Sequence, residues 1–195
     1  METAWGPAFL ERMVEAVEAV RRRLLRATAA LEAAGVAYAV VGGNAVATWV
    51  ARVDEAAVRN TQDVDLLLRR ADLDAATAPL AAAGLLRRHV EGDELFLDGP
   101  GAKARDAVRI VFANEKVRPE YDVPAPDVSE SESTGLYRVV TLPALVRMKL
   151  TSFRIKDKMH LLDLIDVGLV DEGWVATLPP ALGSRLRGLL DDPEG

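Results

Sequence analysis

Residues 40–68 carry the strongest structural signal of the chain and read VVGGNAVATWVARVDEAAVRNTQDVDLLL. They begin inside segment 36–41, which is short, apolar and β-branched and is typical of a buried strand. The pair Gly42-Gly43 breaks this strand, and residues 44–51 have the character of a short helix. Residues 63–68 predict a second strand, which alternates at its start and is apolar at its end. The stretch therefore combines a strand, a glycine turn, a helix and a strand.

Two acidic residues open the second strand. Residues i and i+2 of a strand point to the same side, so Asp63 and Asp65 project together while Val64 faces the opposite layer. Two carboxylates this close repel each other unless a cation neutralises them, and such hard oxygen ligands suit Mg²⁺ or Mn²⁺. The pattern indicates a divalent-metal site. The alternative is that the two acids simply face solvent at the start of the strand.

The glycine pair points to a phosphate-binding turn. Without Cβ atoms, Gly42 and Gly43 let a ligand approach the backbone closely. The helix that starts at Asn44 presents unpaired N–H groups and the positive end of its dipole, which favour an anion. The alternative is a tight turn that binds nothing. The motif is neither a P-loop nor a dinucleotide fingerprint, because no Gly-Lys-Ser/Thr follows and the third glycine is missing. With Arg59 before the two acids, these are parts of a phosphoryl-transfer site.

Composition excludes several other kinds of site. The chain has 195 residues, half of them apolar, and no cysteine, which rules out disulfides, zinc thiolates and cysteine nucleophiles. With only His89 and His160, multi-histidine metal centres are not expected, so metal chemistry falls to carboxylates. The net charge of −6 argues against a strongly basic nucleic-acid-coating protein. The arginine cluster at 21–26 favours a solvated helix face, the alternative being a surface for RNA or a partner.

The sequence predicts neither a signal peptide nor a membrane span. Residues 1–7 lack a basic region, and acidic residues interrupt the segment that follows. No apolar run approaches the roughly 18 residues of a transmembrane helix. We therefore expect a cytoplasmic protein with no membrane association.

The remaining patterns predict a mixed fold. A long helix is expected over 9–34, and a proline-rich surface loop over 114–135. The other expected helices are 73–83, 142–153, 156–167, 171–178 and 181–190, and the other expected strands are 85–90, 94–97, 107–113 and 136–140. This order indicates an α+β protein with a mixed β-sheet flanked by helices. We divide it into an N-terminal helix packing on the core (1–35), the core (36–140) and a helical C-terminal region (141–195).

The two signals together resemble a known superfamily. Residues 40–45 (VVGGNA) followed by 59–67 (RNTQDVDLL) are similar to the nucleotidyltransferases, whose fold is that of DNA polymerase beta. Within that superfamily the chain most resembles the small bacterial AbiEii-type nucleotidyltransferases of toxin–antitoxin systems. A looser similarity runs through 142–165, where the family's Lys, Arg, Lys-Asp and Asp-Leu positions are matched by Lys149, Arg154, Lys156-Asp157 and Asp163-Leu164.

The resemblance implies transfer of NMP from an NTP to a hydroxyl. It implies that Asp63 and Asp65 are catalytic and bind one or two Mg²⁺ (or Mn²⁺) ions, which polarise the α-phosphate. The nucleotide-binding residues that it implies are Gly42, Gly43, Asn44, Arg59, Lys149 and Lys156. Lys149 and Lys156 would share a face if one helix ran through both. The implied acceptor is an RNA or tRNA, a protein hydroxyl or a small molecule, and a toxin of this type has an antitoxin protein as its partner.

One position departs from the superfamily pattern. A third carboxylate is expected on a later strand, where it often serves as the general base, but the aligned position holds Arg109. Asp106 and Glu115 are the candidates to replace it. The alternative function is therefore a catalytically reduced domain that binds a nucleotide or a partner without turnover. A purely structural role, with no nucleotide binding, is the third hypothesis.

Overall fold

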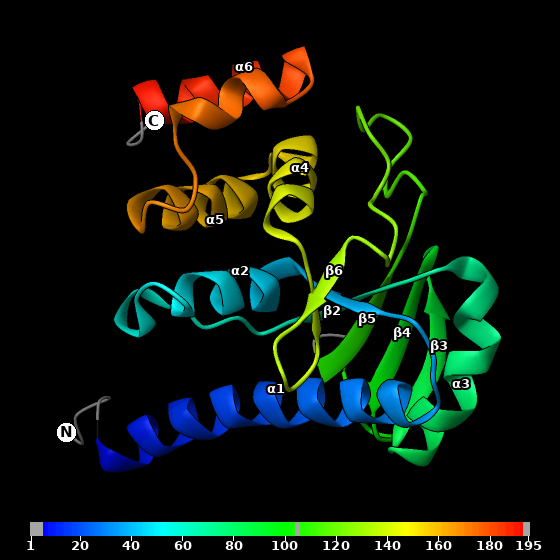
Figure 1. Cartoon of the computed structure of the whole chain (residues 1–195). Coiled ribbons are helices and arrows are strands. Elements are labelled where there is room, and N and C mark those ends of the chain that lie inside the picture. Colours follow the sequence, from blue (N-terminus) through cyan, green and yellow to red (C-terminus); the bar gives the residue numbers. More distant parts are fainter. Residues whose placement is uncertain (1–5, 104–105, 193–195) are drawn as a thin grey trace.

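The protein is built on one mixed seven-stranded sheet, seen in a computed structural model that describes residues 6–103 and 106–192 (Figure 1). Its strands are β1 (Ala39–Val41), β2 (Val64–Leu68), β3 (Leu85–Val90), β4 (Asp93–Asp98), β5 (Ala107–Phe112), β6 (Ser131–Ser133) and β7 (Arg138–Val140). Their order across the sheet is β3-β4-β5-β2-β1-β7-β6. β2 pairs with β5 in parallel and with β1 in antiparallel fashion, so the acid-bearing strand lies at the centre.

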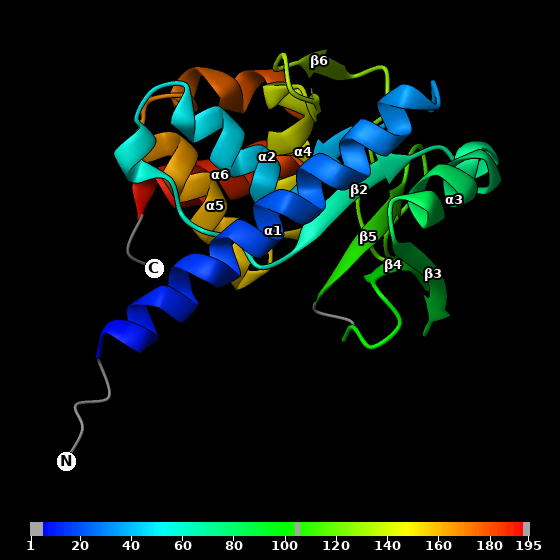
Figure 2. The same ribbon diagram turned by 90° about the horizontal axis from the view of Figure 1, so that it is seen from below.

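Helices cover both faces of this sheet. They are α1 (Pro7–Ala33), α2 (Gly42–Ala51), α3 (Leu73–Ala82), α4 (Leu142–Ser152), α5 (Ile155–Asp166) and α6 (Pro180–Asp191). Helices α1 and α3 lie along one face, whereas α2 and the C-terminal helices α4–α6 gather on the other side (Figures 1 and 2). This arrangement confirms the expected α+β class with a mixed sheet flanked by helices. Within the described part of the chain, no helix has both the length and the apolar character needed to cross a membrane.

The core explains why the central strands are so apolar. Every residue of β1 is buried, and β2 is buried except at Asp65. A strand covered on both faces has no solvent side on which to place polar residues. Asp65 is therefore the one polar side chain that the central strand admits. Its position at the start of β2 suggests a role other than packing.

Helix α1 is only half embedded. Its second half buries Leu24, Ala27 and Leu31 in the core, whereas the apolar side chains of its first half are exposed, namely Leu10, Met13, Val14 and Val17. The prediction that the arginine cluster is a solvated face was wrong for Arg23, which is 5% exposed and donates to Asp98 over 3.1 Å. Arg26 also pairs with Asp98. These ion pairs fasten α1 to the end of β4.

Several predicted boundaries differ from the structure. Helix α2 begins at Gly42, not at Asn44, and Gly42 enters it with a left-handed φ of 69°, which glycine adopts without strain. Strand β6 lies inside the segment expected to be a loop, where it pairs with β7. Residues 172–177 form a 3₁₀ helix in place of the expected α-helix. These differences are local and leave the predicted order of the main elements unchanged.

Candidate functional site

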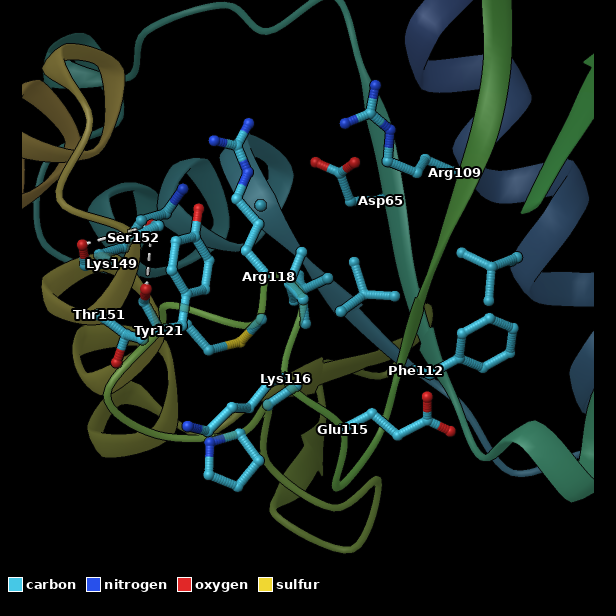
Figure 3. Close-up of a pocket in the computed structure, with 18 of the residues that line it drawn as sticks. Asp65, Arg109, Phe112, Glu115, Lys116, Arg118, Tyr121, Lys149, Thr151 and Ser152 are labelled. Atoms are coloured by element: carbon cyan, nitrogen blue, oxygen red, sulfur yellow. Dashed lines mark hydrogen bonds between the residues drawn. The ribbon is translucent and has the colours of Figure 1, made fainter. Parts of the chain in front are cut away.

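A cavity of about 560 Å³ opens where the ends of β1, β2 and β5 meet the first turn of α2 and helices α4 and α5. Six of the eight site residues predicted from the sequence belong to this region: Gly42, Gly43, Asp63, Asp65, Lys149 and Lys156 line it. Figure 3 shows the side chains of Asp65 and Arg109 next to each other on its wall. The sequence positions are up to 114 apart, so only the fold brings them together.

Asp65 is flanked by a strand on each side. It is in register with Val41 of β1 and with Arg109 of β5. Burial raises the pKa of the Asp65 carboxyl, Arg109 opposes that rise, and the neighbouring Asp63 adds to it. A carboxylate that is both desolvated and repelled by a second carboxylate is stabilised when a cation binds. The electrostatics of Asp65 therefore favour a cation beside its carboxylate.

Asp63 stands one residue before β2 and is held from two sides. Asn44 Nδ2 donates to its backbone carbonyl over 2.7 Å. Lys156 Nζ lies 2.8 Å from its carboxylate Oδ2, and both side chains are about half exposed. Asn44, predicted to bind nucleotide, therefore has a positioning contact in this structure. Lys156 partly neutralises the charge of Asp63.

The structure gives a steric reason for glycine at both positions of the pair, which the sequence only suggested. A Cβ on Gly42 would stand 2.1 Å from Asp65 Oδ2, and one on Gly43 would stand 2.6 Å from Thr61 Oγ1. The two glycines therefore let the first turn of α2 press against the acid-bearing segment. The N-cap residue Val41 gives this turn no side-chain hydrogen bond. Its N–H groups and dipole face the same cavity as Asp65, which is an arrangement that suits phosphate.

A buried ion cluster supports the far wall. Lys149 and Asp157 are 6% and 1% exposed, and Lys149 Nζ lies 3.1 Å from Asp157 Oδ1. Arg154 Nε and Ser152 Oγ donate to the other oxygen of Asp157 over 2.7 and 2.8 Å. No single helix runs through Lys149 and Lys156, because Phe153 adopts a left-handed φ of 45° and separates α4 from α5, in agreement with the two helices expected from the sequence. Both lysines nevertheless line the cavity.

The cluster predicts an acid-sensitive fold. Burial alone would raise the pKa of Asp157, but the hydrogen bond from Arg154 and the charge of Lys149 lower it to about 2. The folded protein then binds fewer protons than the unfolded chain, so its stability falls as pH drops from about 4 towards 2. We expect Asp157→Asn to lose on the order of 2 kcal/mol of unfolding free energy at pH 7. We also expect it to lack this part of the acid dependence.

Urea unfolding at pH 7 and at several values down to pH 2.5 measures both effects. Asp74→Asn is the matched control, because Asp74 is 96% exposed. Equal acid dependence in the wild type and Asp157→Asn would contradict the assignment of the low pKa to this cluster.

Neither candidate replacement for the third carboxylate is free to act as one. Asp106 lies at the opposite end of β5, 3.7 Å from Arg23 Nη2, and does not line the cavity. Glu115 lines the cavity, but Arg70 donates to both its oxygens over 2.7 and 2.6 Å. Arg109 occupies the register position beside Asp65, as the sequence indicated. Asp93, 3.8 Å from Arg109, is an additional acid that sequence reasoning missed.

The donor set suits Mg²⁺ held jointly with a substrate. Among the described residues, no three Asp, Glu or His side chains gather into a metal-binding group. Mg²⁺ is commonly held by one or two carboxylates, with substrate phosphates and waters completing its shell. Asp63 and Asp65 supply that number of carboxylates. The residues present therefore fit a metal that arrives with a nucleotide better than one that the protein holds alone.

The structure does not bring Arg59 to this cavity. Its Nε donates to Asp163 Oδ1 over 2.6 Å, and Asp163 is 7% exposed on α5. Arg59 lines a separate hollow beside α1 and α2. The contact ties the segment before Asp63 to helix α5. In this structure Arg59 is a positioning residue for the acid-bearing segment.

The segment 114–125 adds residues to the cavity that the sequence did not single out. Arg118 and Tyr121 line it (Figure 3). Asp122 next to them forms a 2.8 Å ion pair with Arg185 of α6, which also donates to the backbone carbonyl of Leu150 over 2.7 Å. The segment is therefore fastened to the C-terminal helices. The sequence of this segment is that of an exposed loop and did not predict that it lines the cavity.

Comparison with known proteins supports the fold. No protein-family model and no curated protein matches this sequence. Among solved structures, the chain is similar to the antibiotic-resistance factor ANT(2'')-Ia, an aminoglycoside nucleotidyltransferase whose solution structure shows substrate-regulated conformation dynamics. The two share 16% sequence identity, the match covers 89% of this chain and 94% of the other, and the TM-score is 0.54. The chain has a nucleotidyltransferase-like fold, as the resemblance implied, whereas the AbiEii-type likeness is not confirmed.

Proposed function

We propose that the protein is a metal-dependent nucleotidyltransferase that transfers NMP from an NTP to an acceptor oxygen. The observation that carries the proposal is the close approach of Gly42 to Asp65, which sets two carboxylates against the first turn of a helix within one cavity. A nucleotide needs both parts, because its triphosphate is an anion and its reacting α-phosphate gains charge in the transition state. The fold shared with ANT(2'')-Ia agrees with this activity.

Each part of the cavity has a place in this reaction. The first turn of α2 binds the phosphates through its N–H groups. Asp63 and Asp65 would hold Mg²⁺ with the nucleotide, and bound Mg²⁺ would neutralise charge at the reacting phosphates. Lys156 exchanges its contact with Asp63 for one with a phosphate oxygen. Lys149 is fixed by Asp157 and keeps a positive charge close to Asp65.

A second function has a specific observation in its favour. Arg109 stands beside Asp65, where the superfamily pattern expects an acid, and Asp106 and Glu115 are engaged elsewhere. A domain without a general base can bind a nucleotide and not turn it over. This alternative predicts the same binding site but no release of pyrophosphate.

Calorimetry combined with a pyrophosphate assay separates these functions. We expect NTP binding in the presence of Mg²⁺ to require an intact glycine turn at Gly42-Gly43. The valine side chain of Gly43→Val would meet Thr61, so this variant should weaken NTP binding at least about tenfold. Gly101→Val is the control, because nothing lies within 4 Å of a Cβ at Gly101. Binding with pyrophosphate release supports the transferase, and binding without release supports the alternative. No binding of any NTP to the wild type would contradict both.

A further inference from the structure

The position of Arg109 restricts the kind of acceptor. A neutral hydroxyl becomes a good nucleophile only when a base removes its proton. The position where the superfamily pattern expects such a base is in register with Asp65 and holds the guanidinium of Arg109, which is always protonated and cannot accept a proton. An acceptor oxygen that is already ionised needs no base. Arg109 at this position therefore favours an acceptor whose attacking oxygen is already ionised.

Apart from Asp93, the other acids near the cavity are engaged by cationic partners, Glu94 by Arg87 among them. Asp106 is paired with Arg23 and lies outside the cavity lining. Glu115 is clamped by both nitrogens of Arg70, and this hydrogen bonding lowers the pKa of its carboxyl. A carboxylate so engaged is a weak proton acceptor. Asp93 remains, and its nearest charged partner is Arg109 itself, 3.8 Å away.

The cavity also offers an anion more than one cationic contact. Arg109 is 53% exposed, so its guanidinium can reach a ligand without unfolding a buried pair. Lys116 and Arg118 are exposed on the segment that lines the opposite wall. A guanidinium binds a phosphate through two parallel hydrogen bonds, which gives orientation as well as affinity. The acceptor side is thus lined by side chains that favour an anion.

We propose that the acceptor is a phosphomonoester and that Arg109 binds its phosphate, an inference that rests on the proposed nucleotidyl transfer. An oxygen of this phosphate attacks the α-phosphorus of the NTP and forms a new P–O–P bond. The bond from the α-phosphorus to the oxygen bridging to the β-phosphate breaks, and its electron pair leaves with pyrophosphate. No proton moves in the step, because a phosphomonoester with a second pKa of about 6 is a dianion at pH 7.

Binding is the first test, because it does not require turnover. The wild type is saturated with Mg²⁺ and an NTP analogue that carries a methylene group between its α- and β-phosphates, and glucose 1-phosphate is then titrated by calorimetry. We expect it to bind while glucose does not, and we expect Arg109→Gln to weaken binding about tenfold or more. Arg88→Gln is the matched control, since Arg88 is an exposed arginine of the same sheet outside the cavity lining. A 5′-phosphorylated oligoribonucleotide and its 5′-hydroxyl form are titrated in the same way. Their comparison tells whether the phosphate that binds belongs to a small molecule or to an RNA end.

Turnover is the second test. With an NTP, we expect labelled product from phosphorylated acceptors and none from their hydroxyl counterparts. Asp93→Asn should retain this transfer, since the reaction needs no base. Transfer to neutral hydroxyls that Asp93→Asn abolishes would overturn the inference. If the analogue binds but no phosphomonoester does, the acceptor inference fails while the proposed function stands. If the nucleotide itself does not bind, the proposed function fails and the inference falls with it.

Discussion

Asp65→Asn is expected to abolish nucleotidyl transfer while leaving the fold intact. Stabilisation of a reacting phosphate by a metal contributes several kcal/mol, so loss of this ligand should lower kcat/KM by about a thousandfold or more. The folded state should not suffer in the same way. The Asp65 carboxylate is desolvated and repelled by Asp63, and Asn has nearly the same shape without the charge.

Two measurements on the same variant check this prediction. Transfer is followed with a labelled NTP, and the free energy of unfolding is taken from urea titration at pH 7. Asp54→Asn is the control, because Asp54 caps a short 3₁₀ helix and lies outside the cavity lining. Full activity in Asp65→Asn would remove Asp65 from the catalytic site. A large loss of stability would instead assign it a structural role.

Gly42→Ala is expected to damage both stability and activity. Its Cβ would meet Asp65 Oδ2 at 2.1 Å, and its φ of 69° is a left-handed conformation that alanine adopts only with strain. The strain alone costs roughly 1–2 kcal/mol, and displacement of the Asp65 side chain adds to it. We expect a total loss of about 2–4 kcal/mol, or a fall in Tm of about 4–16 °C for a chain of this size. Because Asp65 must move, transfer should fall with it.

The matched control is Gly188→Ala in helix α6. A Cβ there meets nothing within 4 Å, and Gly188 is exposed in an ordinary helical conformation. Alanine is the better helix former, so this variant should gain about 0.5–1 kcal/mol. Thermal unfolding of both variants decides the matter. Equal Tm values would mean that the contact between Gly42 and Asp65 is not tight in solution.

The fold could be predicted from the sequence where the local pattern is strong. The apolar strand that ends at Gly42, and the acid-bearing strand that begins at Asp63, follow from patterns that a two-sided core imposes. Strand β6 was missed because its three residues, Ser131–Ser133, carry no apolar alternation. The break between α4 and α5 was predicted, since separate helices were expected over 142–153 and 156–167.

The candidate site was predicted in part for similar reasons. Asp65 and the glycine pair are local to one motif, so their shared use of one cavity follows from a short stretch of chain. Arg59 could not be placed, because its partner Asp163 is 104 residues away in the sequence. Tyr121 was missed because only its tertiary position, and no motif, brings it to the cavity. Contacts between segments that are distant in the sequence are the part of the site that a single sequence does not predict.

The most direct test asks which phosphorus of the nucleotide is attacked. The wild type and the Asp63→Ala plus Asp65→Ala double variant are incubated with Mg²⁺, the acceptor panel and an NTP labelled either at the α- or at the γ-phosphate. We predict that the wild type transfers the α-label to an acceptor and releases the γ-label as pyrophosphate, and that the double variant does neither. Transfer of the γ-label to an acceptor, or equal α-labelling by the double variant, would contradict nucleotidyl transfer at Asp63 and Asp65.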